Sequence, residues 1–402
     1  MTIIAFITVS SKVACVACIK LLDSWHLPSL QQNLMNPTNN QLPTTMSGVH
    51  LIGHGGLDQL VYRHDIPTPQ PKDGEVLLKV LAAGVNNTDI NTRIGWYSKQ
   101  VTGDTNSGAD QGYDELDATT ATWSGSALQL PRIQGADVCG EVVSVGSGVN
   151  AERIGERVLV RTMQQDPQTK KRFDCVTFGS EYDGGFAQYT CALSDEAYAV
   201  NTPWSDVELA SIPCAYSTAE NMLHRASLKS GERVLITGAS GGVGSAAVQL
   251  AKRRGAYVIA VAGVTKHDDV KALGADQLVP RGVDLVAAIG ADEVDLVVDL
   301  VAGPDWPQLL DVLRRGGRYA TSGAIAGPMV ELDVRTLYLK DLTFFGCTFQ
   351  DHIVFSNLVS YIEAEEIRPV VAQSYPLKQI HKAQTDFLNK GFTGKLVLIP
   401  ES

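Results

Sequence analysis

The sequence predicts an α/β protein of two domains, one β-rich and barrel-like and one built as a doubly wound parallel sheet. The chain has 402 residues, more than one hydrophobic core normally serves. Short apolar runs closed by Gly, Pro and Asp fill residues 47–201, whereas apolar runs alternate with helical stretches from about residue 202. Such alternation, with fully apolar strands, is typical of a parallel sheet covered by helices on both faces.

The domain boundaries follow from these changes in pattern. We assign residues 47–201 and 351–402 to the β-rich domain, because the last segment does not extend the strand–helix alternation. Residues 202–350 form the predicted parallel-sheet domain, in which WPQLLDVLRRGG (306–317) is expected to be a helix. Residues 98–130 lack periodicity and predict a long inserted loop. Residues 1–46 are interpreted as an N-terminal extension, with disorder as one interpretation.

Composition argues against several classes of function. The net charge of −11 lacks the basic excess that binding to nucleic acid requires. The apolar start of the chain is interrupted by Lys12 and Lys20, so it resembles neither a signal peptide nor a membrane span. The seven cysteines are odd in number and scattered, and the CVAC at 15–18 has no second Cys/His pair. We therefore expect a cytoplasmic protein with a small-molecule substrate.

A glycine-rich turn lies between an apolar strand and an amphipathic helix in VLITGASGGVGSAAVQLAKRRG (234–255). Gly241 and Gly242 let the backbone approach a pyrophosphate, and Gly244 lets the helix pack close to the strand. A second strand at 257–262 completes a βαβ unit of the Rossmann type. The predicted dinucleotide-binding residues of this loop are Ala239, Ser240, Gly241, Gly242, Val243 and Gly244.

The same loop also matches the G-x-S-x-G pattern of a serine hydrolase, through Gly238, Ser240 and Gly242. That alternative requires a downstream acid and histidine, for which Asp299 and either His352 or His381 are the candidates.

The end of the second strand predicts which dinucleotide binds. An NAD site usually has an acidic residue there, whereas this chain has Gly263 followed by Thr265 and Lys266. A hydroxyl and a cation suit a 2′-phosphate, to which Arg281 could add, so NADPH is the predicted cofactor. The alternative is that Lys266 is a solvated lysine at a helix start.

Several phrases together resemble the medium-chain dehydrogenase/reductase superfamily over roughly residues 47–400. They are GEVLLKVLAAGVNNTDINTRIGWY, PRIQGADVCGEVVSVGSGV, the glycine loop, LGAD and GKLVLIP. The resemblance implies a GroES-like catalytic domain beside the Rossmann domain. The zinc enzymes of this superfamily have Cys, His and Cys where this chain has Asn86, Ala136 and Cys214. One ligand of three cannot hold a catalytic zinc, so no zinc is expected.

The resemblance is therefore to the zinc-free branch, the quinone oxidoreductases and 2-enoyl thioester reductases. It implies that Asn86 borders the nicotinamide, that Tyr97 is the proton donor, and that Thr218, Ser322 and Gly323 lie near the nicotinamide. Tyr97 could instead be a wall of the cleft. Asp89 is more simply a helix cap.

These observations predict a zinc-independent NADPH-dependent oxidoreductase that reduces an enone, a quinone or an enoyl ester. An alcohol dehydrogenase of the same fold and a non-catalytic NADPH-binding protein are the alternatives. Trp96 and the insertion at 98–130 bear on the shape of the substrate. The segment DLTFFGCTF (341–349) resembles the edge through which members of the family form homodimers.

Overall fold

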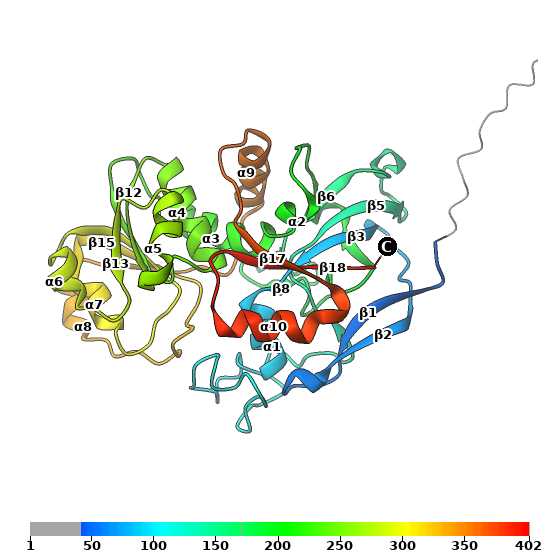
Figure 1. The fold of residues 1–402 in the computed structure, drawn as a ribbon, viewed down its shortest axis with the longest axis horizontal. Helices are drawn as coiled ribbons and strands as arrows, with labels where there is room; N and C mark the ends of the chain where they lie inside the picture. The colour runs from blue at the N-terminus through cyan, green and yellow to red at the C-terminus, as the bar shows by residue number, and fades with distance from the viewer. Residues whose placement is uncertain (1–41, 170, 402) are drawn as a thin grey trace, which may run out of the picture. The chain divides into compact units, whose positions relative to one another are not determined.

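A computed structural model of the chain describes residues 42–169 and 171–401 (Figure 1). The CVAC pair and nearly all of the predicted N-terminal extension lie outside these residues, and β1 (Thr45–Leu51) is the first strand. No helix within the described ranges is both long and apolar enough to cross a membrane.

The β-rich part contains two main sheets. β1 pairs antiparallel with β2 (Leu60–Pro67) and with β4 (Arg132–Ile133). The larger sheet has the order β10-β6-β5-β3-β18-β17, with β9 also paired to β3. Its strands are β3 (Glu75–Gly84), β5 (Cys139–Val145), β6 (Arg157–Val160), β9 (Tyr189–Leu193), β10 (Ala197–Ala199), β17 (Val371–Pro376) and β18 (Lys395–Ile399). A separate hairpin joins β7 (Met163–Gln165) to β8 (Cys175–Thr177).

The C-terminal segment joins this larger sheet. β18 pairs antiparallel with β3, placing Val397 opposite Gly84, and the two strands lie side by side in Figure 1. α10 (Ile380–Asn389) is linked to α1 (Asn87–Ile94) because the Arg93 Nε donates to Gln384 Oε1 at 3.0 Å. The last strand therefore begins close to the first helix.

The second sheet is fully parallel in the described part of the chain, with the order β13-β12-β11-β14-β15-β16. Its strands are β11 (Arg233–Ile236), β12 (Tyr257–Ala262), β13 (Gln277–Pro280), β14 (Val294–Asp299), β15 (Leu313–Thr321) and β16 (Thr343–Gly346). In chain order this is 3-2-1-4-5-6, the order of the dinucleotide-binding doubly wound fold. The predicted fold class is confirmed, and β12 spans the predicted residues.

Helices cover both faces of this sheet because alternate strand residues point in opposite directions. Val234 and Ile236 join a core with α3 and α4, whereas Leu235 packs in another core with α7. The helices from residue 206 to 363 are α2 (Asp206–Leu209), α3 (Pro213–Arg225), α4 (Gly242–Arg253), α5 (His267–Ala272), α6 (Leu285–Ile289), α7 (Trp306–Asp311), α8 (Val334–Leu339) and α9 (His352–Glu363).

The predicted helix at 306–317 is wrong in its second half. α7 ends at Asp311, and β15 begins two residues later with Leu313 paired to Val294. Gly316 has φ +71°, a left-handed conformation that an α-helix does not continue through. The spacing of apolar residues in LLDVL is compatible with an α-helix or a β-strand. Pairing with β14 stabilises the strand.

Candidate active site

The glycine loop connects β11 to α4, with Gly241 as the N-cap of the helix. A Cβ on Gly244 would lie 2.1 Å from the carbonyl oxygen of Gly238, so only glycine allows the helix to pack this close to the strand. A Cβ on Gly241 would have no neighbour closer than 3.5 Å, and this residue is exposed. The free N–H groups at the start of α4 can therefore reach a phosphate, as a dinucleotide site requires.

The C-terminal segment lies directly against this loop. The Gly394 N–H donates to the Ser240 carbonyl at 3.0 Å. A Cβ on Gly242 would lie 2.7 Å from Cδ of Lys395. Gly242 therefore leaves room for a lysine side chain from the β-rich part of the fold, a constraint that the glycine pattern alone does not reveal.

The end of β12 is surrounded by cations. The partly exposed Lys266 donates from Nζ to the carbonyls of Lys390 (2.5 Å) and Phe392 (2.7 Å), so its ammonium is held by the C-terminal segment. Burial, and then Arg281, lower the pKa of Lys266. Thr265 and Arg281 are exposed beside it. A Cβ on Gly263 would lie 3.8 Å from Nη2 of Arg281, so this guanidinium reaches the bend.

α1 begins at Asn87 because Asn86 and Asp89 cap its N-terminus. The Asp89 carboxylate accepts the backbone N–H of Asn86 at 2.7 Å and that of Ala136 at 3.3 Å. Burial raises the pKa of Asp89 to about 7. The interpretation of Asp89 as a cap agrees with these contacts.

A buried network holds the Asn86 side chain. Its Nδ2 donates to Asp137 Oδ2 at 2.8 Å, and its Oδ1 accepts from Lys395 Nζ. Lys395 also forms a 2.8 Å ion pair with Asp137, whose other oxygen accepts the Cys214 backbone N–H at 2.5 Å. Both side chains of the ion pair are at most 3% exposed. Sequence reasoning missed this network, because Asp137 and Lys395 are 258 residues apart and no local spacing links them.

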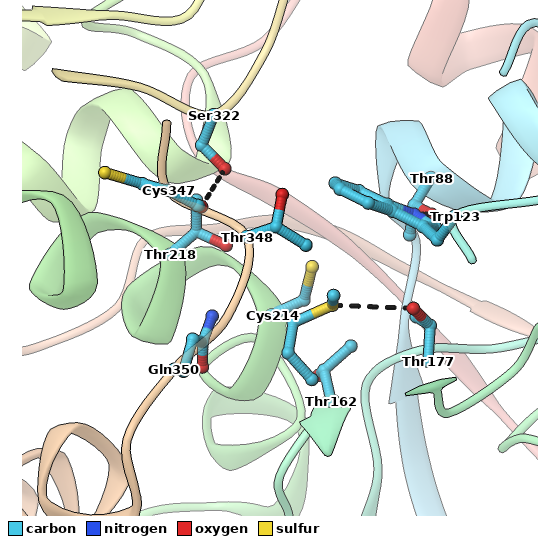
Figure 2. A pocket seen from close by; sticks show the side chains of 11 residues that line it. Thr88, Trp123, Thr162, Thr177, Cys214, Thr218, Ser322, Cys347, Thr348 and Gln350 are labelled. Carbon is cyan, nitrogen blue, oxygen red and sulfur yellow. Dashed lines mark hydrogen bonds between the residues drawn. The ribbon is translucent and has the colours of Figure 1, made fainter. Parts of the chain in front are cut away.

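A cavity lies between α1, α3 and the ends of β15 and β16. Figure 2 shows Thr88 and Trp123 on one side of it, Thr218 and Ser322 on the other, and Cys214 between them. The lining residues are Thr88, Trp123, Thr162, Met163, Thr177, Cys214, Thr218, Ser322, Cys347, Thr348 and Gln350. Hydroxyl groups predominate, and none of these side chains is an acid, a lysine, an arginine or a histidine. The cavity therefore suits a neutral reacting group.

Thr88 accepts two hydrogen bonds at the edge of this cavity. The Tyr97 hydroxyl donates to Thr88 Oγ1 at 3.2 Å, and the Trp123 indole N–H donates to the same oxygen. The Tyr97 and Trp123 rings are 4.9 Å apart. Burial raises the pKa of Tyr97 above its usual range, so this phenol is neutral. Thr88 and Trp123 line the cavity, whereas Tyr97 lies behind them. No sequence pattern singled out either lining residue.

The insertion at 98–130 supplies Trp123 and packs against α1 without a helix or strand of its own. Thr105 Oγ1 donates to Asn91 Oδ1 at 3.1 Å, and the buried Arg93 donates to the Ala109 carbonyl at 3.1 Å. The Trp96 indole N–H donates to the Gly103 carbonyl at 2.9 Å. The insertion therefore forms one wall of the cavity.

Two of the remaining predicted residues, Thr218 and Ser322, lie across the cavity from Trp123 (Figure 2). Ser322 follows β15, and its hydroxyl donates to the Cys347 carbonyl at 2.9 Å. A Cβ on Gly323 would lie 3.2 Å from the Leu300 carbonyl oxygen, so this turn is tight. Burial raises the pKa of Cys214 far above its usual range, which keeps the thiol protonated. Thr218 lies one turn after Cys214 on α3.

The serine hydrolase alternative fails on geometry. Asp299 accepts from the hydroxyls of Thr237 and Tyr319, each at 2.6 Å. His352 bonds Tyr198 at 2.8 Å, and His381 bonds the Leu60 carbonyl at 2.8 Å. None of these groups contacts Ser240, so no triad forms.

Comparisons with known proteins agree with this architecture. The family described as "Alcohol dehydrogenase GroES-like domain" matches residues 72–203, and "Zinc-binding dehydrogenase" matches residues 242–364. Human quinone oxidoreductase is 28% identical over 370 residues, which cover 88% of this chain and 98% of that protein. Acryloyl-coenzyme A reductase of Metallosphaera sedula is 27% identical, with 83% and 95% covered.

A solved structure is more similar in sequence. It comes from Sinorhizobium meliloti 1021 and is provisionally named an alcohol dehydrogenase. It is 46% identical, covers 90% of this chain and 98% of its own, and has a TM-score of 0.80. A GroES-like domain joined to a Rossmann sheet with a glycine loop defines an NAD(P)-dependent oxidoreductase. The chain belongs to the medium-chain dehydrogenase/reductase superfamily.

Proposed function

We propose that the protein is an NADPH-dependent, zinc-independent reductase of an activated C=C bond or quinone. The observation that carries this proposal is the position of a neutral, hydroxyl-lined cavity between α1 and α3, in the same fold as a glycine loop suited to a dinucleotide. The names of the human and Metallosphaera sedula relatives support reduction of a quinone or an unsaturated thioester.

The residues available to hold the cofactor come from the loop, the β12 end and the cavity. We propose the loop residues 239–244 for the pyrophosphate, Gly263, Thr265 and Lys266 for the adenosine ribose phosphate, and Asn86, Thr218, Ser322 and Gly323 for the nicotinamide. When bound, NADPH supplies the hydride, which is the difficult part of the chemistry. The protein then has to orient the substrate and stabilise or protonate the enolate oxygen.

The Thr88 hydroxyl is placed to serve that oxygen. Its own oxygen accepts from both Tyr97 and Trp123, so its hydrogen is free to be donated toward the cavity. Tyr97 is the proposed source of the proton, and it reaches the substrate through Thr88. A neutral phenol remains a donor at pH 7.

The absence of zinc is proposed from the ligand set. The described residues hold no group of three His, Cys, Asp or Glu side chains that could bind a metal ion. Asn86 is bonded to Asp137 and Lys395, and Ala136 offers no donor atom. A catalytic zinc requires three protein ligands.

An alcohol dehydrogenase is the second candidate, favoured by the provisional name of the 46% identical structure. A panel of substrates separates the reductase from the alcohol dehydrogenase. An enone, a quinone and an enoyl thioester are tested with NADPH, primary and secondary alcohols are tested with NADP⁺, and the metal content of the protein is measured. Turnover of the first group by metal-free protein supports our proposal. Turnover restricted to alcohols would refute it, and tight NADPH binding without any turnover would indicate a non-catalytic protein.

We also propose a homodimer formed through β16. This strand lies at the edge of the parallel sheet, and Phe344 within it is 37% exposed, with Tyr338 (59%) and Leu339 (56%) on the preceding helix. An exposed apolar edge favours pairing with a second copy. The molar mass measured by light scattering should be twice the 43.1 kDa of the chain. Tyr338→Glu should lower this mass toward that of a single chain. A wild-type mass of 43.1 kDa would contradict the proposal.

A further inference from the structure

Lys390 is a cation beside the cofactor domain that the sequence pattern did not single out. It is the C-cap of α10, with φ +51°, and belongs to the segment that lies on the glycine loop. Its carbonyl accepts from Lys266 Nζ. The backbone contact therefore fixes Lys390 next to the residue predicted to recognise the 2′-phosphate.

Among the residues that the structure describes, the Lys390 ammonium has no anionic partner within 4.0 Å. Its Nζ lies 3.9 Å from the centroid of the Phe387 ring and 3.4 Å from Asn87 Oδ1. Burial, followed by repulsion from Lys266, lowers the pKa of Lys390 to about 8. An amide oxygen and a ring face compensate poorly for the loss of water around a buried ammonium.

The neighbouring cations are not neutralised either. Within residues 42–169 and 171–401, Lys266, Arg281 and Lys390 form no ion pair with a carboxylate within 4.0 Å. Asp269 is the charged group of opposite sign that acts on Lys266, and its carboxylate accepts from Thr393 Oγ1 at 2.7 Å. The result is an excess of positive charge at the end of β12.

Lys266 retains capacity for a ligand. An ammonium has three N–H donors, and two of those of Lys266 go to backbone carbonyls. The third is free for a phosphate oxygen. Lys266 thus holds the segment that carries Lys390 and still has a donor for an anion.

We propose that Lys390 is a specificity-determining residue for the 2′-phosphate of NADPH, completing with Lys266 and Arg281 a three-cation site formed by both domains. This inference rests on the proposed NADPH dependence. The ribose of a dinucleotide lies at the end of the second strand of such a sheet, which is where these cations meet. Charge from the C-terminal segment would then make cofactor choice a property of both domains.

Binding measurements test this inference without relying on activity. Calorimetric dissociation constants are compared for NADPH, NADH, 2′,5′-ADP and 5′-ADP with the wild type and with Lys390→Met, which keeps the packing on Phe387. We expect Lys390→Met to raise the dissociation constants of NADPH and 2′,5′-ADP by about tenfold or more, as loss of a charge-assisted hydrogen bond does. The dissociation constants of NADH and 5′-ADP should be unchanged. Lys390→Arg should restore most of the affinity.

The control is Lys382→Met on the same helix, whose ammonium is paired with Asp386 at 2.7 Å; it should bind like the wild type. If Lys390→Met is unstable, Lys390→Gln takes its place. A Lys390 variant that keeps the wild-type preference for NADPH would overturn the inference. A variant whose affinities for NADPH and NADH fall equally would also overturn it, and either result would leave the proposed function unaffected. Equal wild-type affinities for NADPH and NADH would instead refute the proposed cofactor.

Discussion

The glycine loop and the cavity between α1 and α3 are assembled in opposite ways. The loop is one continuous strand, turn and helix between residues 233 and 253. The cavity draws Thr88 from α1, Trp123 from the insertion, Cys214 from α3 and Ser322 from the end of β15. The first is a local solution that any dinucleotide-binding protein can use. The second depends on long-range packing, which is where members of one fold differ.

The largest effect is expected where the two regions are joined, at the Lys395–Asp137 ion pair. Lys395→Met leaves the Asp137 carboxylate buried without its cation and frees the Asn86 amide. We expect the free energy of unfolding to fall by about 3–5 kcal/mol, the usual consequence of breaking a buried pair. Urea unfolding measures this free energy. Lys378→Met is the control, because Lys378 is exposed. A loss below about 1 kcal/mol would show that the pair does not join the two regions.

The proposed proton relay from Tyr97 through Thr88 should give the next largest effect. Thr88→Val and Tyr97→Phe should each lower kcat on the order of a hundredfold, because each interrupts the path of the same proton. The double variant should be no slower than either single variant, since residues that act as one unit are non-additive. Initial rates with an enone and NADPH measure this. Near-full activity of Tyr97→Phe would make Tyr97 a wall residue, and multiplicative losses would contradict a relay.

Within the glycine loop, two glycines should respond differently to alanine. Gly244→Ala places a methyl group 2.1 Å from a carbonyl oxygen, whereas Gly241→Ala meets nothing within 3.4 Å. We expect Gly244→Ala to destabilise by about 1–3 kcal/mol through overpacking. Gly241→Ala should leave stability nearly unchanged and weaken only dinucleotide binding. Equal stabilities would show that close helix packing does not require Gly244.

The smallest effect is a pH dependence. Lys390 has a pKa of about 8, lowered by burial and then by the charge of Lys266. Arg281 and Asp269 are the charged groups that act on Lys266 in turn. The ammonium is present below that pH and lost above it, while the 2′-phosphate is already a dianion above a pKa of about 6. NADPH affinity should therefore fall as pH rises from 8 to 9, by at most tenfold, and NADH affinity should stay level. A flat NADPH profile would contradict a charged Lys390 at the phosphate.

The difference in assembly also explains what the sequence could predict. Gly241, Gly244 and β12 follow from local pattern, and Asp89 follows from capping chemistry. Lys395 reaches Asn86 because β18 pairs with β3, and Lys390 lies beside Lys266 through a contact between residues 124 positions apart. Trp123 belongs to a segment with no periodicity. Tyr97 was identified by position, but its hydroxyl faces Thr88. Side-chain rotamers and packing determine which hydroxyl faces the cavity. The spacing of residues along the sequence does not predict either of them.

We propose that the chain reduces its substrate without a metal. The rate of NADPH oxidation with an enone or quinone tests this, measured on protein dialysed against a chelator, with zinc determined in the same sample. We predict full activity at substoichiometric zinc and no increase when zinc is added back. Activity that disappears with the zinc and returns with one equivalent would contradict zinc-independent reduction.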